Sequence, residues 1–252
     1  MIKILLSGCN GKMGQVITRL SEQYDDLSIV AGYDITDSGK NPYPVFSDLR
    51  KCSVRPDVLI DFSNPAALES ILTYATSTEI PVVIATTGHS QTQARMLKKT
   101  SEIIPVFYSA NMSLGINLLI GLVKKAAKLL QTSFDIEIVE KHHNQKIDAP
   151  SGTALAIADA VNSVLDQKHE YVYDRHSRRK KRSRNEIGIH AIRGGTIVGE
   201  HSVIFAGNDE IIEIRHSALS KEIFATGALS AARFIIGKKP GMYDMNDLVG
   251  RE

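Results

Sequence analysis

The amino-acid sequence predicts an α/β fold in two domains: an N-terminal Rossmann-type domain with a parallel sheet, and an α+β domain with an open mixed sheet. Two observations lead to this prediction. Through the first hundred residues, short β-branched runs alternate with longer amphipathic stretches, as in strand–helix–strand units with right-handed crossovers. After Asn111 this alternation ends, and a long helical pattern is followed by several strand-like runs.

The first domain takes its expected elements from the alternation. Apolar, β-branched runs predict strands over residues 2–6, 28–33, 58–62, 82–85 and 106–108. Apolar residues at helical spacing predict intervening helices over 13–24, 66–76 and 91–101. Such an order favours a parallel sheet with helices on its faces.

The second domain begins with a helix expected over 113–130. A strand over 136–139 and a helix over 151–165 follow, and then strand-like runs at 188–193, 197–205 and 210–216, which we expect to be antiparallel. A final helix over 223–237 is long enough to return to the first domain. We therefore expect residues 1–112, completed by 222–252, to form one domain and 113–221 the other.

Composition is that of an ordinary globular protein. The 252 residues are 43% hydrophobic and 23% charged, and no apolar run approaches the roughly 20 residues that span a bilayer. The first residues resemble a buried strand and lack the features of a signal peptide, so we expect a cytoplasmic protein without a membrane partner. Cys9 and Cys52 are too few for a disulfide framework or a zinc site, and we expect no metal.

Positive charge is concentrated in residues 175–184. This stretch holds seven of the 30 Lys and Arg and none of the 28 acids, which leaves 23 bases and a net charge of −5 elsewhere. A like-charge block is typical of a mobile, solvated loop. Attraction of an anionic ligand and contact with nucleic acid are the alternatives, and a single basic stretch is weak support for the latter.

A glycine-rich turn directly follows the first expected strand. It is a GxxGxxG variant of the dinucleotide fingerprint and contains Gly8, Asn10, Gly11, Lys12, Met13 and Gly14. Glycines let the backbone approach a pyrophosphate, which rests on the amides of a helix N-terminus. Glycine turns also occur for structural reasons alone, but the strand before and the helix after this one favour dinucleotide binding.

Asp34 ends the second expected strand, twenty residues past Gly14, where an acid meets the adenosine ribose. A carboxylate there favours a free 2′-hydroxyl, and the next residue is Ile35 instead of an arginine, so NADH is the preferred cofactor. Lys12 could partly neutralise an added 2′-phosphate, which leaves NADPH open.

Polar and small residues also follow the third, fourth and fifth expected strands. Ligands of open parallel sheets sit outside the carboxyl ends of the strands, so these residues are candidates for orienting a nicotinamide. An ordinary loop role is the equal alternative for each of them. They are Phe62, Ser63, Thr86, Thr87, Gly88, Ala110, Asn111 and Met112.

A loop after the strand at 136–139 contains His142, His143 and Lys146. Histidine exchanges protons near neutral pH, and lysine is a cation or, with a lowered pKa, a proton donor. A single histidine is most often structural, but two histidines and a lysine ahead of a helix N-terminus favour a functional site.

Ser151, Gly152 and Thr153 open the helix that follows this loop. The amides and hydroxyls of a first helical turn can bind a carboxylate, and glycine permits close approach of the ligand. N-capping by Ser151 alone would leave Gly152 and Thr153 without a purpose. A hydride donor, a proton donor and a carboxylate site together indicate reduction of an acidic unsaturated compound.

At this point the sequence resembles the 4-hydroxy-tetrahydrodipicolinate reductase (dihydrodipicolinate reductase) family over nearly its whole length. The resemblance lies in the glycine turn, Asp61-Phe62, Thr86-Thr87-Gly88, residues 110–113, 140–146, 148–154 and 193–201. It implies reduction of 4-hydroxy-tetrahydrodipicolinate to tetrahydrodipicolinate with NADH or NADPH, in the diaminopimelate route of lysine biosynthesis. It also implies a homotetramer joined through the sheet of the second domain, which is then a substrate-binding and oligomerisation domain.

The resemblance also implies roles for single residues. His142 would be the proton donor and Lys146 the second catalytic cation, while His143, Ser151, Gly152 and Thr153 would bind the carboxylates of a small cyclic substrate. Residues 193–201 would be scaffold. Two features depart from the family pattern: Ala85 stands where glycine is usual, and the stretch 175–184 is unusually basic.

Two other functions compete with this interpretation. A different amino-acid pathway dehydrogenase, of the aspartate or homoserine type, shares the fold but lacks the His-His-x-x-Lys loop followed by Asp-Ala-Pro-Ser-Gly-Thr. A nucleotide-sensing regulator that binds nucleic acid would need a DNA-binding helix pair, and the sequence shows none.

Overall fold

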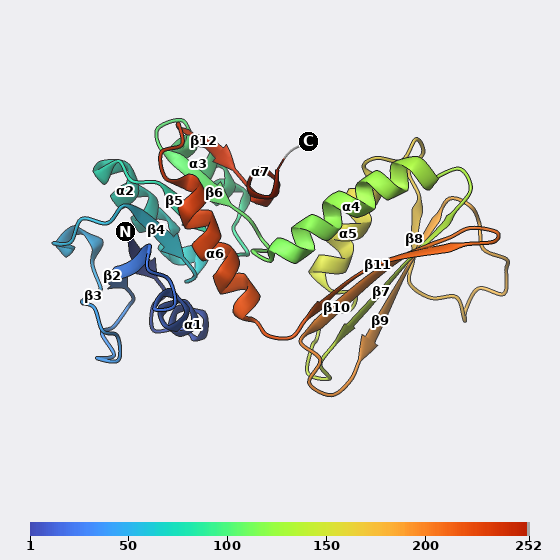
Figure 1. Cartoon of the computed structure of the whole chain (residues 1–252), viewed down its shortest axis with the longest axis horizontal. Coiled ribbons are helices and arrows are strands. Elements are labelled where there is room, and N and C mark those ends of the chain that lie inside the picture. The colour runs from blue at the N-terminus through green and yellow to red at the C-terminus, as the bar shows by residue number, and fades with distance from the viewer. Residues whose placement is uncertain (251–252) are drawn as a thin grey trace. The chain divides into compact units, whose positions relative to one another are not determined.

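The structure, a computed structural model, describes residues 1–250 of the chain. The chain forms two compact units (Figure 1): Met1–Leu114 together with the segment from Glu222 onward, and Gly115–Lys221. In the described part of the chain, none of the helices combines the length and the apolar character needed to cross a membrane.

A seven-stranded sheet forms the centre of the first unit, with the strand order β12-β6-β5-β4-β1-β2-β3 and parallel pairing throughout. Its strands are β1 (Ile2–Ser7), β2 (Leu27–Tyr33), β3 (Val45–Phe46), β4 (Val58–Asp61), β5 (Val82–Ile84), β6 (Pro105–Tyr108) and β12 (Gly241–Tyr243). The helices are α1 (Lys12–Ser21), α2 (Leu68–Thr78), α3 (Gln91–Ser101), α6 (Glu222–Ile235) and α7 (Met245–Val249), with the short 3-10 helices η1 (Leu49–Lys51) and η2 (Pro65–Ala67). This is the Rossmann-type sheet that the alternation predicts.

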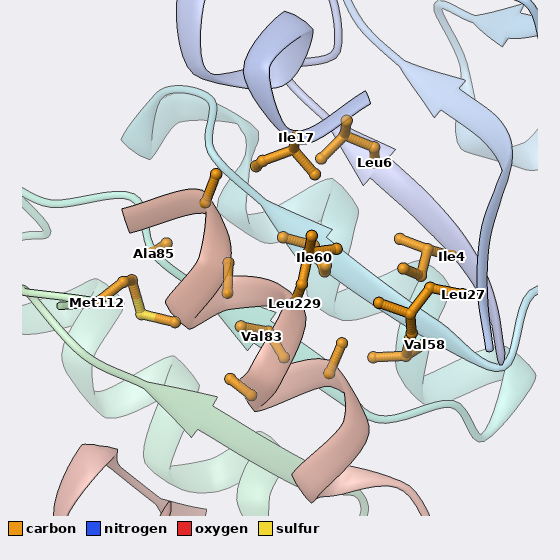
Figure 2. Close-up of a cluster of buried hydrophobic side chains, with 14 of the residues drawn as sticks. Ile4, Leu6, Ile17, Leu27, Val58, Ile60, Val83, Ala85, Met112 and Leu229 are labelled. Atoms are coloured by element: carbon orange, nitrogen blue, oxygen red, sulfur yellow. The ribbon is translucent and has the colours of Figure 1, made fainter. Parts of the chain in front are cut away.

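The strand side chains alternate between two cores, one on each face of this sheet. Ile4 and Leu6 of β1 belong to one core, while Leu5 belongs to the other. The first core includes α1 and α6, and Figure 2 shows Leu229 of α6 beside the strand residue Ile60. The second core is closed by α2 and α3. Because α6 contributes to the first core, the C-terminal segment is part of the N-terminal unit.

The second unit contains a five-stranded mixed sheet with the order β11-β10-β7-β9-β8. Its strands are β7 (Asp135–His142), β8 (Glu170–Val172), β9 (Glu186–Arg193), β10 (Gly199–Ala206) and β11 (Ile211–Ala218), and its helices are α4 (Leu114–Leu130) and α5 (Gly152–Asn162). Both helices pack on one face of the sheet, where Val123 of α4 and Ile157 of α5 share a core with Ile138 of β7 (Figure 1).

The directions of the late strands differ partly from expectation. β10 is antiparallel to β7 and β11, but β9 is parallel to β7 and to β8. The expectation of antiparallel strands is therefore wrong for β9. The chain passes from β7 through α5 and the edge strand β8 before it forms β9, and a crossover of this length allows parallel strands.

The basic stretch 175–184 lies against acidic side chains of the second unit. Arg182 donates to Glu137 Oε1 at 3.0 Å and to Asp135 Oδ1 at 2.8 Å. Arg175 donates to Glu137 Oε1 at 2.6 Å and to Glu186 Oε2 at 3.0 Å, and Glu186 is only 2% exposed. The expectation of a solvated loop is therefore wrong for Arg182, whose side chain is 18% exposed, while Arg175 is exposed but paired with two carboxylates. Asp135 and Glu137 come from β7, about forty residues earlier in the sequence, whereas Glu186 of β9 lies only 11 residues after Arg175.

Candidate active site

The glycine turn between β1 and α1 has no space for side chains at two positions. Gly8 has φ +78°, and a Cβ there would lie 2.4 Å from the carbonyl oxygen of Phe62. A Cβ on Gly14 would lie 2.2 Å from the carbonyl oxygen of Gly8. Gly11 precedes α1, and no side chain caps this helix. Bare backbone at an uncapped helix N-terminus fits the pyrophosphate of a dinucleotide.

Asp34 lies next to this turn, at the end of β2. Its Oδ2 accepts a hydrogen bond from the amide of Asn10 at 2.9 Å, and its Oδ1 accepts one from the amide of Ile35 at 2.8 Å. The carboxylate is therefore fixed against the glycine turn, where the ribose-binding acid of a Rossmann domain is found. Lys12 is exposed in the first turn of α1.

A pocket of about 450 Å³ lies at the carboxyl ends of the strands of the first unit. It brings together most of the residues predicted to bind the cofactor, and its lining is Gly11, Lys12, Met13, Phe62, Ser63, Ala85, Thr86, Thr87, Ala110, Met112 and Phe224. The amide of Ser63 donates to Thr86 Oγ1 at 2.9 Å, which joins the ends of β4 and β5. Phe224 comes from α6 and was not predicted, although the returning helix was.

The remaining predicted cofactor residues lie outside this lining. Gly8, Asn10, Gly14 and Asp34 form the turn and its flank. Gly88 has φ +83° in the loop after β5. Asn111 lies in the loop after β6, where its Oδ1 accepts a hydrogen bond from the amide of Ser113 at 2.9 Å.

Below the pocket, β4 ends in the buried carboxyl of Asp61. Ser63 Oγ donates to Asp61 Oδ1 at 2.5 Å, and burial raises the pKa of this carboxyl. Since Ser63 lines the pocket, Asp61 holds the side chain of a pocket residue from within the fold.

In the second unit, β7 places Glu140 and His142 on the same face of the sheet. Its residues alternate between half-buried and buried, so Glu140 and His142 lie on the face that also holds Ile136 and Ile138. The strand alternation therefore carries a carboxylate and an imidazole toward the side covered by α4 and α5.

Glu140 is completely buried and receives four hydrogen bonds. Its Oε2 lies 2.6 Å from His142 Nδ1 and accepts from Arg193 at 2.8 Å. Its Oε1 accepts from Arg193 at 2.7 Å and from the amide of Ser151 at 2.9 Å. Burial alone would raise the pKa of Glu140, but the hydrogen bonds from Arg193, His142 and the Ser151 amide lower it on balance.

Ser151 caps helix α5 and contacts a second histidine. Its Oγ accepts from the amide of Ala154 at 3.2 Å and lies 3.1 Å from His201 Nε2. The rings of His201 and His142 meet edge to face, with centroids 5.3 Å apart. Burial and the neighbouring His142 lower the pKa of His201 from 6.5 to about 4, so this imidazole is neutral at physiological pH.

Lys146 and the first turn of α5 lie in the same loop region. Lys146 Nζ pairs with Asp148 Oδ1 at 2.7 Å, and this pairing lowers the pKa of the Asp148 carboxyl. A Cβ on Gly152 would meet nothing within 4 Å, so the helix N-terminus has open space beside it. Thr153 occupies the same turn.

The loop is anchored by the connection between β9 and β10. The amide of Gly194 donates to the carbonyl oxygen of His142 at 2.9 Å. The amide of Asn144 donates to the carbonyl oxygen of Gly195 at 3.2 Å. His143 is half-buried between these anchors. The structure thus gathers His142, Ser151 and the first turn of α5 around Glu140, with Lys146 in the same loop. In the residues that the structure describes, no group of three potential metal ligands converges.

Three residues of this site were not predicted as functional: Glu140, Arg193 and His201. Arg193 and His201 were expected to be scaffold; Arg193 contacts Glu140, and His201 contacts Ser151. A glutamate two residues before a candidate histidine on a strand was the available signal, because positions i and i+2 share a face.

The first unit has the architecture and the phosphate turn of the nucleotide-dependent dehydrogenases and reductases, and the second unit offers such an enzyme a histidine beside a cationic loop.

Two family models match the chain: Dihydrodipicolinate reductase, N-terminus, over residues 2–112, and Dihydrodipicolinate reductase, C-terminus, over residues 115–249. The chain is 56% identical over 249 residues to the 4-hydroxy-tetrahydrodipicolinate reductase of Caldanaerobacter subterraneus subsp. tengcongensis, covering 99% of this chain and 98% of the relative. It is 52% identical over 246 residues to the Clostridium tetani protein of that name, covering 98% and 96%.

Among solved structures, the dipicolinate-bound dihydrodipicolinate reductase from Paenisporosarcina sp. TG-14 is similar, with a TM-score of 0.83 and 25% identity over 98% of this chain and 99% of that one. The chain therefore belongs to the dihydrodipicolinate reductase family, whose members are NAD(P)H-dependent oxidoreductases. This membership does not favour the two alternatives, an aspartate or homoserine dehydrogenase and a nucleic-acid-binding regulator.

Proposed function

We propose that this chain reduces 4-hydroxy-tetrahydrodipicolinate to tetrahydrodipicolinate in the diaminopimelate route of lysine biosynthesis. The observation that carries the proposal is the placement of His142, in contact with Glu140, beside the first turn of α5 in a chain that matches the family along both units. The Paenisporosarcina relative is described as dipicolinate-bound, which supports a planar dicarboxylate as the kind of ligand.

The chemistry assigns separate tasks to the residues of the second unit. A bound nicotinamide supplies the hydride. The hydroxyl of the substrate leaves as water, and one proton is taken up for each hydride added. His142 delivers the proton, and Lys146 stabilises negative charge on the substrate. His143, Ser151, Gly152 and Thr153 bind the carboxylates, because amides in a first helical turn attract anions.

The cofactor-binding residues of the proposal are those of the glycine turn and the pocket. Gly8, Gly11 and Gly14 let the pyrophosphate approach the backbone, and Asp34 binds the ribose hydroxyls. We infer NADH as the preferred cofactor, because the Asp34 carboxylate repels a 2′-phosphate. Separate measurement of kcat/KM with NADH and with NADPH tests this, and a strong preference for NADPH would show that Lys12 outweighs Asp34.

We also propose a cytoplasmic homotetramer without a membrane or nucleic-acid partner. The sheet face turned away from α4 and α5 carries Val139, Ile192 and Ile204, and Ile192 is 46% exposed. Apolar side chains on an uncovered sheet face support a contact between copies of the chain. Light scattering coupled to size-exclusion chromatography tests the assembly, and a monomer at micromolar concentration contradicts it.

The direct test of function is a coupled assay. Freshly made product of dihydrodipicolinate synthase is offered with NADH or NADPH, and loss of nicotinamide absorbance is followed. We expect turnover that depends on this substrate. Absence of turnover with both cofactors, in protein that is folded and binds NADH, would overturn the proposal.

Two variants test the assigned roles. His142→Gln should lower kcat about 100-fold or more, since general acid catalysis contributes roughly 10²–10⁴-fold, and should leave NADH affinity nearly unchanged. Lys146→Ala should damage kcat and substrate KM together. An unchanged kcat in the first variant, or an unchanged kcat/KM in the second, removes that residue from the site.

A further inference from the structure

Glu140 is a completely buried carboxylate in contact with His142, the proposed proton donor. It is 0% exposed, and both of its oxygens are saturated by contacts from three different parts of the chain. Arg193 comes from β9, the Ser151 amide from the N-cap of α5, and His142 from its own strand. A buried carboxylate is stable as an anion only when it is paired and hydrogen-bonded in this way.

We propose that Glu140 and Arg193 form a positioning pair, which holds the imidazole of His142 with Nδ1 turned toward the carboxylate so that Nε2 is the atom that exchanges the proton. This inference rests on the proposed function, since it names the reacting atom of the proposed donor. Neither Glu140 nor Arg193 touches the reacting atoms, and both act through His142.

The geometry selects one ring nitrogen. A carboxylate only accepts hydrogen bonds, so His142 Nδ1 at 2.6 Å must carry a proton and donate it to Glu140 Oε2. In the neutral ring, Nε2 is then the unprotonated atom. Arg193 binds both oxygens of Glu140 in the bidentate manner of a guanidinium, which fixes the plane of the carboxylate and thus the direction of the hydrogen bond to His142.

Gly199 of β10 lies at the other nitrogen of the ring. A Cβ at this position would lie 3.1 Å from His142 Nε2 and 3.4 Å from its Cδ2. The backbone of Gly199 has no positive φ, so conformational freedom does not explain the glycine. Space at Nε2 does. Any larger residue would crowd the atom that we assign to proton transfer.

Arg193 also connects this pair to the cationic loop. Its guanidinium donates to the carbonyl of Asp148 at 2.6 Å, and the side chain of Asp148 pairs with Lys146. One arginine therefore fixes both the carboxylate behind His142 and the segment that carries Lys146. His201, whose neutral ring meets the edge of His142, adds no competing positive charge at physiological pH.

The same strand contains a matched comparison. Glu137 lies 2.8 Å from His190 Nε2 and accepts hydrogen bonds from Arg175 and Arg182, so it has the same kinds of partners. It is three residues away from Glu140, on the opposite face of β7, and does not contact His142. Glu137→Gln therefore measures what removal of such a charge costs the fold, without touching the proposed site.

The first test compares kcat and KM in Glu140→Gln and Glu137→Gln. We expect kcat to fall about 100-fold in Glu140→Gln, with substrate KM changed less than about threefold, because orientation of a general acid acts on the chemical step. Glu137→Gln should keep kcat within about twofold. Equal kcat values in the two variants, or a loss in Glu140→Gln that lies only in KM, would overturn the assignment.

The second test needs no substrate and therefore separates this inference from the proposed function. ¹⁵N NMR of histidine-labelled protein, with His142 assigned from the His142→Gln variant, reports which nitrogen of the neutral ring carries the proton. We expect Nδ1 in the wild-type protein and a mixture of both forms in Arg193→Lys, which keeps the charge but loses the bidentate contact. A wild-type ring protonated at Nε2 would refute the inference even if the enzyme is active, and this measurement also stands if Glu140→Gln does not fold.

Discussion

Gly14 shows that the glycine turn between β1 and α1 has no room for even one additional carbon atom. Its missing Cβ would lie 2.2 Å from the Gly8 carbonyl and 2.7 Å from the Cα of Cys9, and both are backbone atoms that cannot rotate away. We expect Gly14→Ala to lower the free energy of unfolding by about 1–3 kcal/mol, as overpacking does, and to weaken NADH binding. Urea unfolding and fluorescence titration with NADH measure the two effects.

Gly121→Ala is the matched control for this variant. Gly121 lies inside α4, and a Cβ there meets nothing within 4 Å. Alanine is favoured over glycine in a helix by about 1 kcal/mol, so this variant should be slightly more stable and bind NADH normally. If Gly14→Ala behaved like Gly121→Ala, the close approach at the turn would have no energetic meaning.

Asp148 supplies the negative charge that faces Lys146 in this structure. A substrate carboxylate would compete with it for the ammonium group, whose Nζ lies 2.7 Å from Asp148 Oδ1. Under the proposed function, Asp148→Asn should strengthen inhibition by dipicolinate by up to about fivefold, since exposed ion pairs contribute about 0.2–1 kcal/mol. The measurement is the inhibition constant at low ionic strength.

Asp159→Asn controls for the change in net charge. Asp159 lies in α5 and accepts a hydrogen bond from Tyr171, away from Lys146. Its removal should leave the inhibition constant unchanged. Weaker inhibition in Asp148→Asn would mean that the carboxylate helps to hold Lys146 in place for the ligand.

At the same scale, sequence patterns could indicate candidate catalytic residues but not the side chains that hold them. His142 and Lys146 were recognisable because their side chains can move protons and lie close together in the sequence. Arg193 lies 53 residues from Glu140, and only the pairing of β7 with β9 brings the two together. Support of this kind depends on strand partners, which local patterns do not specify.

At the scale of elements, Arg175 and Arg182 tie the basic stretch 175–184 to acidic side chains of the second unit. Arg182 is the centre of this arrangement, because it donates to Glu137, Asp135 and three backbone carbonyls. Its side chain is only 18% exposed. We expect Arg182→Met to lower the free energy of unfolding by about 2–3 kcal/mol, because it removes five hydrogen bonds made by one largely buried side chain, two of them to carboxylates.

Arg179→Met removes an equal charge from the same stretch. Arg179 is exposed, and surface substitutions of this kind usually change stability by less than about 0.5 kcal/mol. Urea unfolding of both variants compares them directly. Equal stability of the two would restore the picture of a solvated loop.

The longer elements were predictable because their periodicity extends over many residues. The helix expected over 113–130 and the strand pattern at 210–216 correspond to α4 and β11. The edge strands β3 and β12, with two and three residues, are too short to produce a pattern. The parallel direction of β9 was missed for a different reason, since direction follows from the crossover through α5 and β8 and not from the strand itself.

At the scale of the whole molecule, each unit has its own hydrophobic packing, with two cores in the first unit and one in the second. The first core is completed by α6, whose residues follow the entire second unit in the sequence. Truncation before Glu222 would therefore remove a layer from the N-terminal sheet. The return of the final helix to the first domain was predictable from its length, but the strand and helix residues that it contacts there were not.

The pH dependence of stability should report on the buried histidine of the second unit. His201 is 4% exposed, and its pKa is lowered from 6.5 to about 4 in the folded protein. Between pH 6.5 and about pH 4, His201 binds a proton in the unfolded chain but not in the folded chain. The contribution of His201 to the free energy of unfolding is therefore complete above pH 6.5 and is lost as the pH falls toward 4. Burial also lowers the pKa of His216, which acts in the same direction. Glu137 and Glu140, whose pKa values are lowered, lose their contribution only in more acidic solution.

We therefore expect the free energy of unfolding to fall by about 2 kcal/mol through His201 between pH 7 and pH 4.5. The measurement is urea unfolding at several pH values in this range, for the wild-type protein and His201→Asn. The variant should be less stable at pH 7, where it loses the contact to Ser151, and its stability should depend less steeply on pH. His176→Asn, which changes an exposed histidine, should keep the wild-type slope. An equally steep slope in His201→Asn would show that proton uptake at other groups, and not at this buried imidazole, destabilises the protein in mild acid.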